Sequence, residues 1–208
     1  CCQFDDLYNN LNTLMKEKQP DVIIAEAVGS CTDLAATVIQ PLKQYYADKF
    51  KTAPLTIVVE PARLLHELNL DENTKPFFSQ SVSYIFEKQL AEADIIALNK
   101  VDRYSEEEIA KLKAYLQQRY PQTIIQTFSA ERGDNLEALT HTWLTTDLGG
   151  DKVLDIDYEL YAEGEAQLAW MNILGDIKAE QDINPREWAE KLLDNLNKHF
   201  IREKMAIA

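Results

Sequence analysis

The stretch Asp94–Asp102, Asp-Ile-Ile-Ala-Leu-Asn-Lys-Val-Asp, decides how the rest of the chain is interpreted. Its apolar run, Ile95 to Leu98, is short and continuous, which is typical of a strand buried on both faces of a parallel sheet. The run ends directly in the polar turn Asn99–Asp102. Open α/β sheets bind ligands at the carboxyl ends of their strands. The stretch therefore predicts a buried strand that delivers hydrogen-bonding side chains to a ligand site.

The side chains of this turn have hydrogen-bonding groups that could bind guanine. The carboxylate of Asp102 can accept from the ring N–H and the exocyclic amine of guanine, a donor pair that adenine lacks. Asn99 can tie neighbouring loops together, and the stem of Lys100 can lie along the base plane. Four residues are a weak signal by themselves, because they can also form a plain strand-to-helix turn. The interpretation therefore depends on what the other strand ends carry.

Length and charge limit the class of protein. A chain of 208 residues can hold one large α/β domain, or one domain and part of a second. The net charge of −14 argues against a nucleic-acid partner, and no apolar run approaches the ~20 residues of a membrane span. We therefore expect a soluble, cytoplasmic protein.

The cysteines and the start of the chain add two expectations. Cys1, Cys2 and Cys31 are too few for a disulfide framework, which favours a reducing compartment. The sequence begins without an initiator Met or a signal-peptide pattern, so we expect a fragment or a processed product.

Strand-like and helix-like segments alternate along most of the chain, which predicts the α/β class with a mainly parallel sheet. Amphipathic spacing predicts a helix from about Phe4 to Lys18. Thr32 or Asp33 can cap the next helix, and Pro41 is expected to kink it. A capping box at Ser105 predicts another helix. The predicted strands are Val22–Ala25, Leu55–Val59, Ile95–Leu98 and Thr123–Phe128.

The pattern changes after Leu148-Gly149-Gly150-Asp151, the best candidate linker. Tyr158–Gln167 is expected to be helical, Leu168–Ile177 to be a strand, and Asn184-Pro185 to open a helix. A single strand without an obvious partner suggests a domain that is only begun. We therefore expect a partial nucleotide-binding domain at 1–147 and the beginning of a smaller α+β domain at 153–208.

Two further strand ends carry signals that match the turn after Leu98. Glu26-x-x-Gly29 can place a carboxylate near a nucleotide-bound Mg²⁺ or an attacking water, and a backbone N–H near a γ-phosphate. Ser129-Ala130 can present a backbone N–H to the guanine carbonyl. Each has a structural alternative: Glu26 as a solvent-exposed strand end, Ser129 as a helix cap, Lys100 as cover for an apolar edge.

The order and spacing of these motifs resemble the third, fourth and fifth nucleotide motifs of a P-loop GTPase. Glu in the third motif resembles the CobW/HypB/UreG family, whose members insert metals or cofactors into client proteins. Cys1-Cys2 looks like the last two residues of the Cys-x-Cys-Cys metal-binding element of CobW-type members. The segment Asp157–Ala166 is similar to members labelled as cobalamin-synthesis proteins. The resemblance implies GTP and Mg²⁺ as ligands, GTP hydrolysis, and delivery of a metal or corrinoid cofactor to a client metalloprotein or corrinoid protein.

The sequence departs from the family in one respect. It contains no Gly-x-x-x-x-Gly-Lys-Ser/Thr and no Gly-Lys dipeptide, so the loop that cradles phosphates is missing. In the family this loop and its strand precede the Cys element. We therefore expect a P-loop GTPase-like sheet that lacks its first strand, and a chain that is inactive alone. The expected strand order is Val22–Ala25, a gap, Leu55–Val59, Ile95–Leu98 and Thr123–Phe128. The gap is expected to stay open, to close by direct pairing of the two edges, or to be filled by a partner chain.

Two questions stay open from the sequence: which residues bind a metal, and whether the protein hydrolyses GTP. Thiolates suit Zn²⁺ and softer transition ions, but Cys1 and Cys2 are only part of a tetrahedral set. Cys31 is either a third ligand or a small buried apolar residue. A rival function is a non-hydrolysing module that binds a metal or a client protein on a GTPase scaffold. A doubly wound dinucleotide enzyme would need a Gly-x-Gly-x-x-Gly fingerprint, which is absent.

Overall fold

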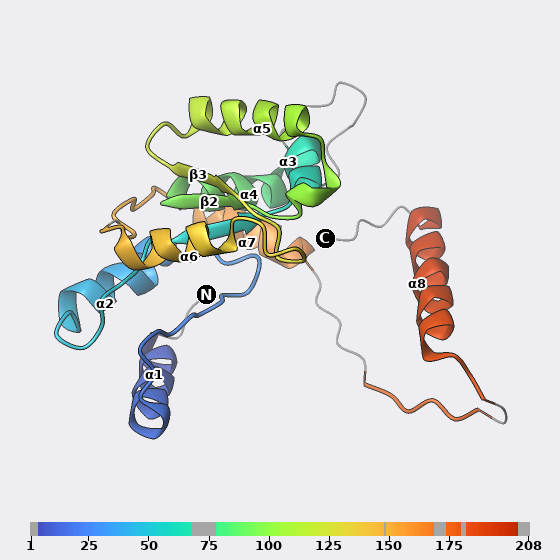
Figure 1. Cartoon of the computed structure of the whole chain (residues 1–208), viewed down its shortest axis with the longest axis horizontal. Helices are drawn as coiled ribbons and strands as arrows, with labels where there is room; N and C mark the ends of the chain where they lie inside the picture. The colour runs from blue at the N-terminus through green and yellow to red at the C-terminus, as the bar shows by residue number, and fades with distance from the viewer. Residues whose placement is uncertain (1–3, 68–77, 148, 169–173, 180–181, 204–208) are drawn as a thin grey trace. The chain divides into compact units, whose positions relative to one another are not determined.

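The computed structural model describes the chain except residues 1–3, 68–77, 148, 169–173, 180–181 and 204–208 (Figure 1). Contacts divide it into two compact units, Cys1–Gln167 and Leu168–Ala208. The described elements of the first unit are α1 (Phe4–Lys18), the π-helical η1 (Ala35–Ile39), α2 (Gln40–Tyr45), β1 (Thr56–Val59), α3 (Pro61–Glu67), α4 (Gln80–Glu92), β2 (Ile95–Leu98), the 3-10 turn η2 (Val101–Arg103), α5 (Glu106–Arg119), β3 (Ile124–Thr127), α6 (Leu136–Thr145) and α7 (Tyr158–Gln167). The second unit contains α8 (Pro185–Arg202).

Three parallel strands form the sheet, in the order β1-β2-β3. Thr56 of β1 is opposite Ile95 of β2, and Ile95 is opposite Ile124 of β3. All four residues of β2 are fully buried, as the continuous apolar run predicts. The α/β class, the parallel pairing of these three strands and their order are therefore confirmed.

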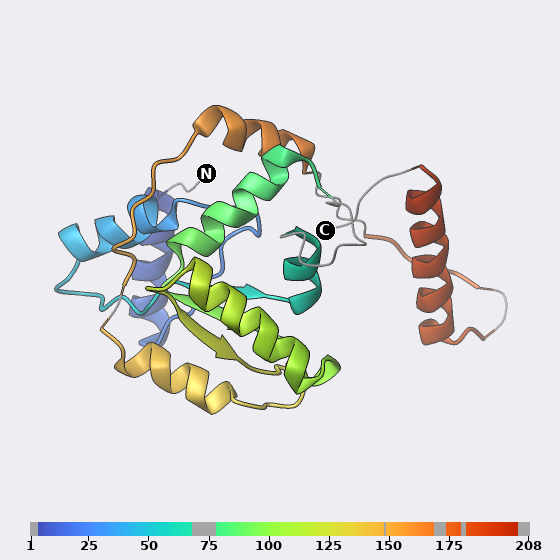
Figure 2. The same cartoon turned by 90° about the horizontal axis from the view of Figure 1, so that it is seen from above.

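Helices cover both faces of the sheet, and α5 and α6 lie on opposite sides of it (Figures 1 and 2). Alternate residues of β2 point to the two faces. Ile96 and Leu98 pack with residues of α3, α4 and α5. Ile95 and Ala97 pack with Leu139 of α6 and with Trp143 beside it. The strand that carries the polar turn is thus fixed from both sides.

The prediction of a strand at Val22–Ala25 is wrong. These residues are not in a strand, and among the described residues none pairs with them. Val22 is 56 % exposed and Ile24 is 78 % exposed. A strand is stable only where a neighbour takes up its backbone hydrogen bonds, and this segment has no such neighbour in the described part of the chain. Sequence periodicity identifies an apolar run but not the partner that it needs.

Most of the predicted helices form. α1 has the predicted bounds, and Ser105 and Glu108 make the predicted capping box of α5. Pro41, which was expected to kink its helix, follows a π-helical turn in which the N–H of Gln40 donates to Ala35 O. Proline has no N–H for the regular α-helical bond, which explains the change of helix type at this point. Within the described residues, no helix is both long and apolar enough to cross a bilayer.

The cap of this helix comes from an unexpected residue. Leu34 at the helix start makes no side-chain cap bond, so the prediction of a cap by Thr32 or Asp33 is wrong. Instead, Oε2 of Glu92 in α4 accepts from the N–H of Ala35 at 3.3 Å. A side chain distant in sequence can take this role because the orphan N–H groups of a helix accept any well-placed oxygen.

α7 packs across the start of α4, which brings it into the first unit (Figure 2). A Cβ on Gly164 would lie 2.6 Å from the Ser81 carbonyl oxygen, so only glycine permits this approach. The side chain of Gln167 donates to Ser81 Oγ at 3.0 Å. The chain therefore stays with the first compact unit as far as Gln167.

α8 of the second unit begins at the predicted N-cap, Asn184, whose side chain accepts from two backbone N–H groups of the first turn. The described residues 174 to 177 are not in a strand, contrary to the prediction for Leu168–Ile177, and residues 169 to 173 of that prediction lie outside the described residues. Trp188, Leu192 and Leu196 of α8 are exposed within the described residues.

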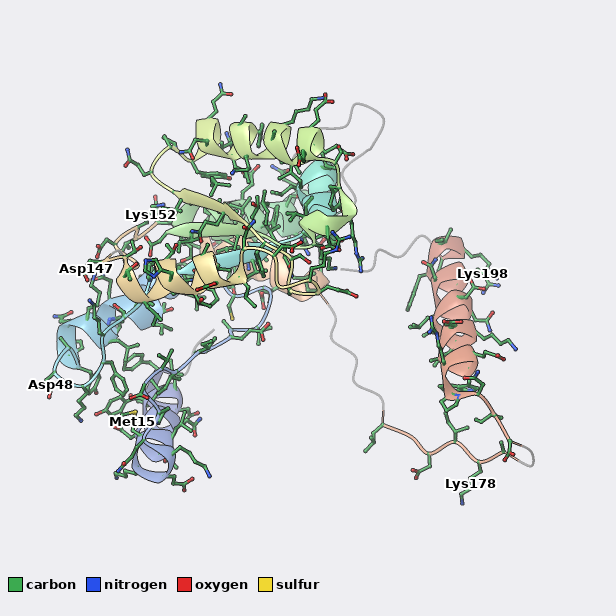
Figure 3. All side chains as sticks on the ribbon, in the orientation of Figure 1. Met15, Asp48, Asp147, Lys152, Lys178 and Lys198 are labelled. Atoms are coloured by element: carbon green, nitrogen blue, oxygen red, sulfur yellow. The ribbon has the colours of Figure 1, made fainter. Side chains whose placement is uncertain are left out.

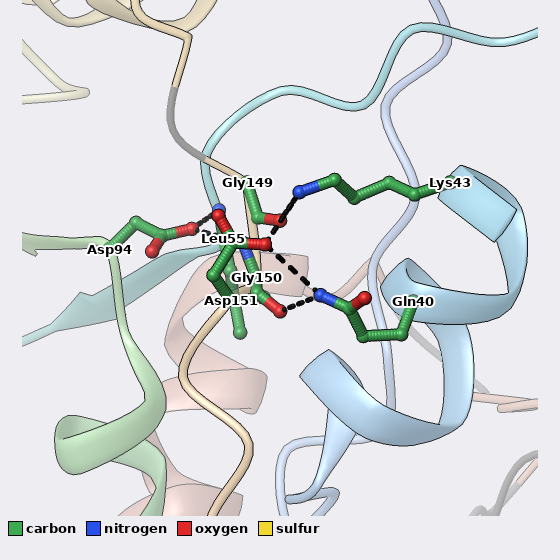
Figure 4. A network of polar contacts seen from close by, with 7 residues as sticks. All are labelled: Gln40, Lys43, Leu55, Asp94, Gly149, Gly150 and Asp151. Carbon is green, nitrogen blue, oxygen red and sulfur yellow. Dashed lines mark hydrogen bonds and ion pairs between the residues drawn. The ribbon is translucent and has the colours of Figure 1, made fainter. Parts of the chain in front are cut away.

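A buried carboxylate, that of Asp94, joins three segments of the chain at the amino ends of the strands (Figure 4). Oδ2 of Asp94 accepts from Leu55 N at 2.9 Å and from Gly150 N at 2.7 Å. Gly150 has φ +61° and lies against Ile39, where a Cβ would meet side-chain atoms at 2.7 Å. Lys152, labelled in Figure 3, donates to the carbonyl of Ala93 and to Thr123 Oγ1. This network fixes the amino ends of all three strands.

Asp94→Ala should destabilise the first unit strongly. The substitution leaves the N–H groups of Leu55 and Gly150 without an acceptor, at a cost of about 2–4 kcal/mol in the free energy of unfolding. Urea unfolding measures the loss. The control is Asp147→Ala, which removes an ion pair with Lys51 whose side chains are 90 % and 79 % exposed, and it should leave the urea midpoint near that of wild type. Equal midpoints for Asp94→Ala and Asp147→Ala would contradict the structural role of Asp94.

Glu92 should make stability depend on pH. Burial raises the pKa of its carboxyl from 4.5 to about 6, because the hydrogen bonds from Ala35 and Thr32 only partly offset the loss of water. The stabilising contribution of the neutral form is fully present below pH 4.5 and is lost as pH rises through 6, which amounts to about 2 kcal/mol. Glu92→Gln, measured by urea unfolding from pH 4 to 7, should gain this amount relative to wild type. Parallel pH curves for the two proteins would show that folding does not raise the pKa of the Glu92 carboxyl.

Candidate functional site

The polar turn after β2 is tied to the loop after β3 by Asn99. Its Oδ1 accepts from Ala130 N at 3.0 Å and from Lys100 N at 2.7 Å. This is the tie between neighbouring loops that the sequence predicts for Asn99. β2 and β3 are parallel, so their carboxyl ends lie at one edge of the sheet. The structure therefore brings Asn99–Asp102 together with Ser129 and Ala130.

Lys100 bridges the ends of β2 and β1. Its backbone is left-handed, with φ +62°, and its Nζ lies 2.6 Å from Oε2 of Glu60. Glu60 follows β1 directly, at the position next to Asn99 in the strand register. Sequence reasoning did not include Glu60 in the site. The signal was available, because an acidic residue directly after an apolar strand run lies at the same sheet edge as the polar turn.

Asp102 combines an ionised carboxylate with an unused acceptor. The hydroxyl of Ser129, which is fully buried, lowers the pKa of Asp102 by hydrogen bonding, and the positive charges of Arg132 and Arg103 act in the same direction. Oδ1 of Asp102 is buried and has no hydrogen-bond partner among the described residues. A buried acceptor without a donor is costly, so this atom fits a ligand that brings an N–H group.

The backbone donors expected to meet a guanine carbonyl are already in use. Ala130 N donates to Asn99, and Ser129 N donates to the carbonyl of Asp134 at 3.0 Å. Ser129 Oγ accepts from Arg132 N, as in a turn cap. A guanine carbonyl would therefore have to share the Ala130 N–H with Asn99.

Glu26 and Gly29 lie on an exposed segment. Within the described part of the chain, no hydrogen bond or ion pair joins either residue to the Asn99–Asp102 turn. Just after them the chain becomes buried: Ser30, Cys31 and Thr32 are each 4 % exposed. The motif itself is therefore exposed to solvent, whereas the residues that directly follow it are buried.

The described residues do not form a metal site. They contain no group of three or more His, Cys, Asp or Glu side chains placed to hold a metal ion. Cys31 is buried, and Cys1 and Cys2 lie outside the described residues. For Mg²⁺ the third motif offers Glu26, a single exposed carboxylate, and nucleotide phosphates and waters would have to supply the other oxygen ligands.

Comparison with known proteins identifies the family. A family model described as "CobW/HypB/UreG, nucleotide-binding domain" matches residues 1–126, which include Glu26, Gly29 and the Asn99–Asp102 turn. No curated protein and no solved structure matched the chain. The match covers more than half of the 208 residues, and the parallel sheet with its helices agrees with a P-loop GTPase-like fold. The chain belongs to the CobW/HypB/UreG family of nucleotide-binding proteins.

Proposed function

We propose that this chain supplies the guanine-binding edge of a GTP-binding protein that hydrolyses GTP and couples hydrolysis to the delivery of a metal or corrinoid cofactor. One observation carries the proposal: Asn99 ties the turn after β2 to the loop after β3, and Asp102 beside them keeps a buried oxygen without a partner. Family membership supports the nucleotide class.

Asp102 is the residue that would select guanine. Its lowered pKa keeps the carboxylate ionised at neutral pH, and an ionised carboxylate is an acceptor only. Guanine presents two adjacent N–H donors to such a group, whereas adenine presents a ring acceptor beside its amine. The Lys100 stem, held by Glu60, would lie along the base, and the Ala130 N–H would meet the guanine carbonyl.

Glu26 and Gly29 would serve the phosphate end. The exposed Glu26 carboxylate can orient an attacking water, and the Gly29 N–H can approach a γ-phosphate without a side chain in the way. Hydrolysis also needs a phosphate-binding loop, and the 208 residues contain no such motif. Hydrolysis is therefore proposed for a site that also contains a phosphate-binding loop, and not for these 208 residues alone.

The proposed partners follow from the family. Zn²⁺ or another transition ion would be held by Cys1 and Cys2, with the buried Cys31 either a third ligand or a small apolar residue, and passed to a client metalloprotein or corrinoid protein in the cytoplasm. The alternative, a non-hydrolysing module that binds a metal or a client, would keep the metal-binding residues and make no use of the Asp102 acceptor.

Amide NMR shifts of the 208-residue chain test the guanine site. Without a phosphate loop, we expect GTP to bind weakly and ATP not at all, and the base of GTP should shift the Asn99–Asp102 and Ser129–Ala130 amides. Asp102→Asn replaces an acceptor by a donor and leaves a guanine donor unpaired, at a cost of roughly 1–3 kcal/mol, or about 5- to 140-fold in affinity. The same variant should gain a response to xanthosine triphosphate, whose carbonyl replaces the guanine amine.

The matched control is Asp134→Asn, the same chemical change in the exposed loop after β3. It should keep the wild-type preference for GTP. Equal responses of wild type and Asp102→Asn to GTP, or a wild-type response to ATP as large as that to GTP, would refute the guanine assignment and favour the non-hydrolysing alternative.

Metal content tests the cysteine assignment. Two thiolates leave a tetrahedral Zn²⁺ site incomplete, so the purified chain should bind zinc loosely and lose it to a mild chelator. The double variant Cys1→Ser, Cys2→Ser should bind no zinc, as measured by elemental analysis after dialysis. Tightly held zinc in the double variant would place the ligands elsewhere in the chain.

A further inference from the structure

α4 carries two polar side chains in a stripe that is otherwise apolar. Val82 and Ile85 are each 3 % exposed, and at helical spacing the same stripe continues through Gln89 to Glu92. Glu92 is fully buried. Polar residues at these positions need partners, because burial of an unpaired carboxylate is costly.

The partners lie on residues 29–35, which we call the anchored loop. Nε2 of Gln89 donates to the carbonyl oxygens of Gly29 at 2.8 Å and Cys31 at 2.9 Å. Glu92 accepts from the Thr32 hydroxyl at 3.2 Å and from Ala35 N at 3.3 Å. Two side chains of one helix thus hold both ends of the loop.

A fifth hydrogen bond to the anchored loop comes from α7. The hydroxyl of Tyr158 donates to Oδ2 of Asp33 at 2.5 Å. Asp33 has φ +64°, a left-handed backbone that costs free energy for a residue other than glycine and persists where surrounding contacts hold it. The loop is therefore fixed from two helices, while Glu26 just before it remains exposed.

Loop position and carboxylate burial depend on each other. If the loop leaves α4, Glu92 loses both donors and its site must take up water, since a buried carboxylate without partners is unstable. If Glu92 is replaced by an apolar residue, the Thr32 hydroxyl and the Ala35 N–H lose their acceptor instead. Separating the loop from α4 therefore costs free energy, because polar groups on both sides lose their hydrogen-bond partners.

We propose that Gln89 and Glu92 are positioning residues that hold the anchored loop on α4, so that Glu26-x-x-Gly29 meets the phosphate end of a guanine nucleotide bound at Asn99–Asp102. The role rests on the proposed function, because it requires a nucleotide at that edge. α4 continues through Ala93 and Asp94 into β2, whose far end carries Asn99, so the anchored loop and the turn are attached at different ends of one helix-strand unit. One helix-strand unit thereby sets the place of both the base-reading turn and the phosphate-facing loop.

Amide hydrogen exchange of the 208-residue chain tests the anchoring without any nucleotide. Glu92→Met keeps the side-chain length and removes the acceptors, and it should speed exchange of the residue 31–35 amides at least about tenfold. Glu92→Gln keeps a carbonyl acceptor and should restore slow exchange. Glu87→Met is the control, the same change at a half-exposed position of the same helix, and it should leave the loop unchanged.

Unchanged loop exchange in Glu92→Met would overturn the proposal. Gln89→Met supplies a second test of the same loop if Glu92→Met does not fold, and slow exchange of the β2 amides shows whether each variant is folded. Wild-type loop exchange in a folded Gln89→Met variant would equally overturn the proposal.

Nucleotide response separates the positioning role from the proposed function. With millimolar GTP and Mg²⁺, the Gly29 amide of wild type should shift, and with GDP it should not. In Glu92→Met the Gly29 response should be lost while the Asn99–Asp102 response remains. A Gly29 response that survives in Glu92→Met, or is absent from wild type while the turn responds, would overturn the positioning role. Absence of any response at Asn99–Asp102 in wild type would instead overturn the proposed function.

Discussion

The Asp94 carboxylate is the interaction on which the arrangement of the first unit depends. It holds the N–H groups of Leu55 and Gly150 at the amino end of the sheet, within hydrogen-bond distance of one oxygen. Pairing at that end fixes the register along the strands, because a parallel ladder has no freedom once its first pair is set. Four residues later Val59 faces Leu98, and the next residues, Glu60 and Asn99, stand side by side. The geometry of the edge that carries Glu60 and Asn99 is thus set at the opposite end of the sheet.

Buried polar groups organise the rest of the unit in the same manner. Asp94 and Glu92 lie within three residues of each other, between α4 and β2, and each holds a distant segment through backbone N–H groups. Such bonds contribute little net stability while intact and cost much when one partner is removed. Apolar side chains form the core, and the hydrogen bonds of Glu92 and Asp94 fix the positions of the segments around Ala35 and Gly150 beside it.

Much of this could be predicted from the sequence. β2, its polar turn and the order of β1, β2 and β3 follow from continuous apolar runs and the family resemblance, and the capping box of α5 follows from local residue types. Val22–Ala25 shows the limit: its composition suits a strand, but a strand also needs a neighbour. Glu92 shows another limit, because its partners Thr32 and Ala35 are far away in the chain. The stripe from Val82 to Glu92 signals that something polar lies opposite, without saying what.

The edge position of β1 has a consequence for the behaviour of the chain in solution. In the described part of the sheet β1 pairs on one side only, and Val58 is 55 % exposed there. An uncovered strand edge with apolar side chains is a template on which another extended segment can add, which is how colloidal association of sheet proteins begins. The net charge of −14 opposes such encounters through repulsion between like-charged copies. Added salt screens that repulsion within roughly 10 Å at 0.1 M, so ionic strength controls the colloidal stability of this chain.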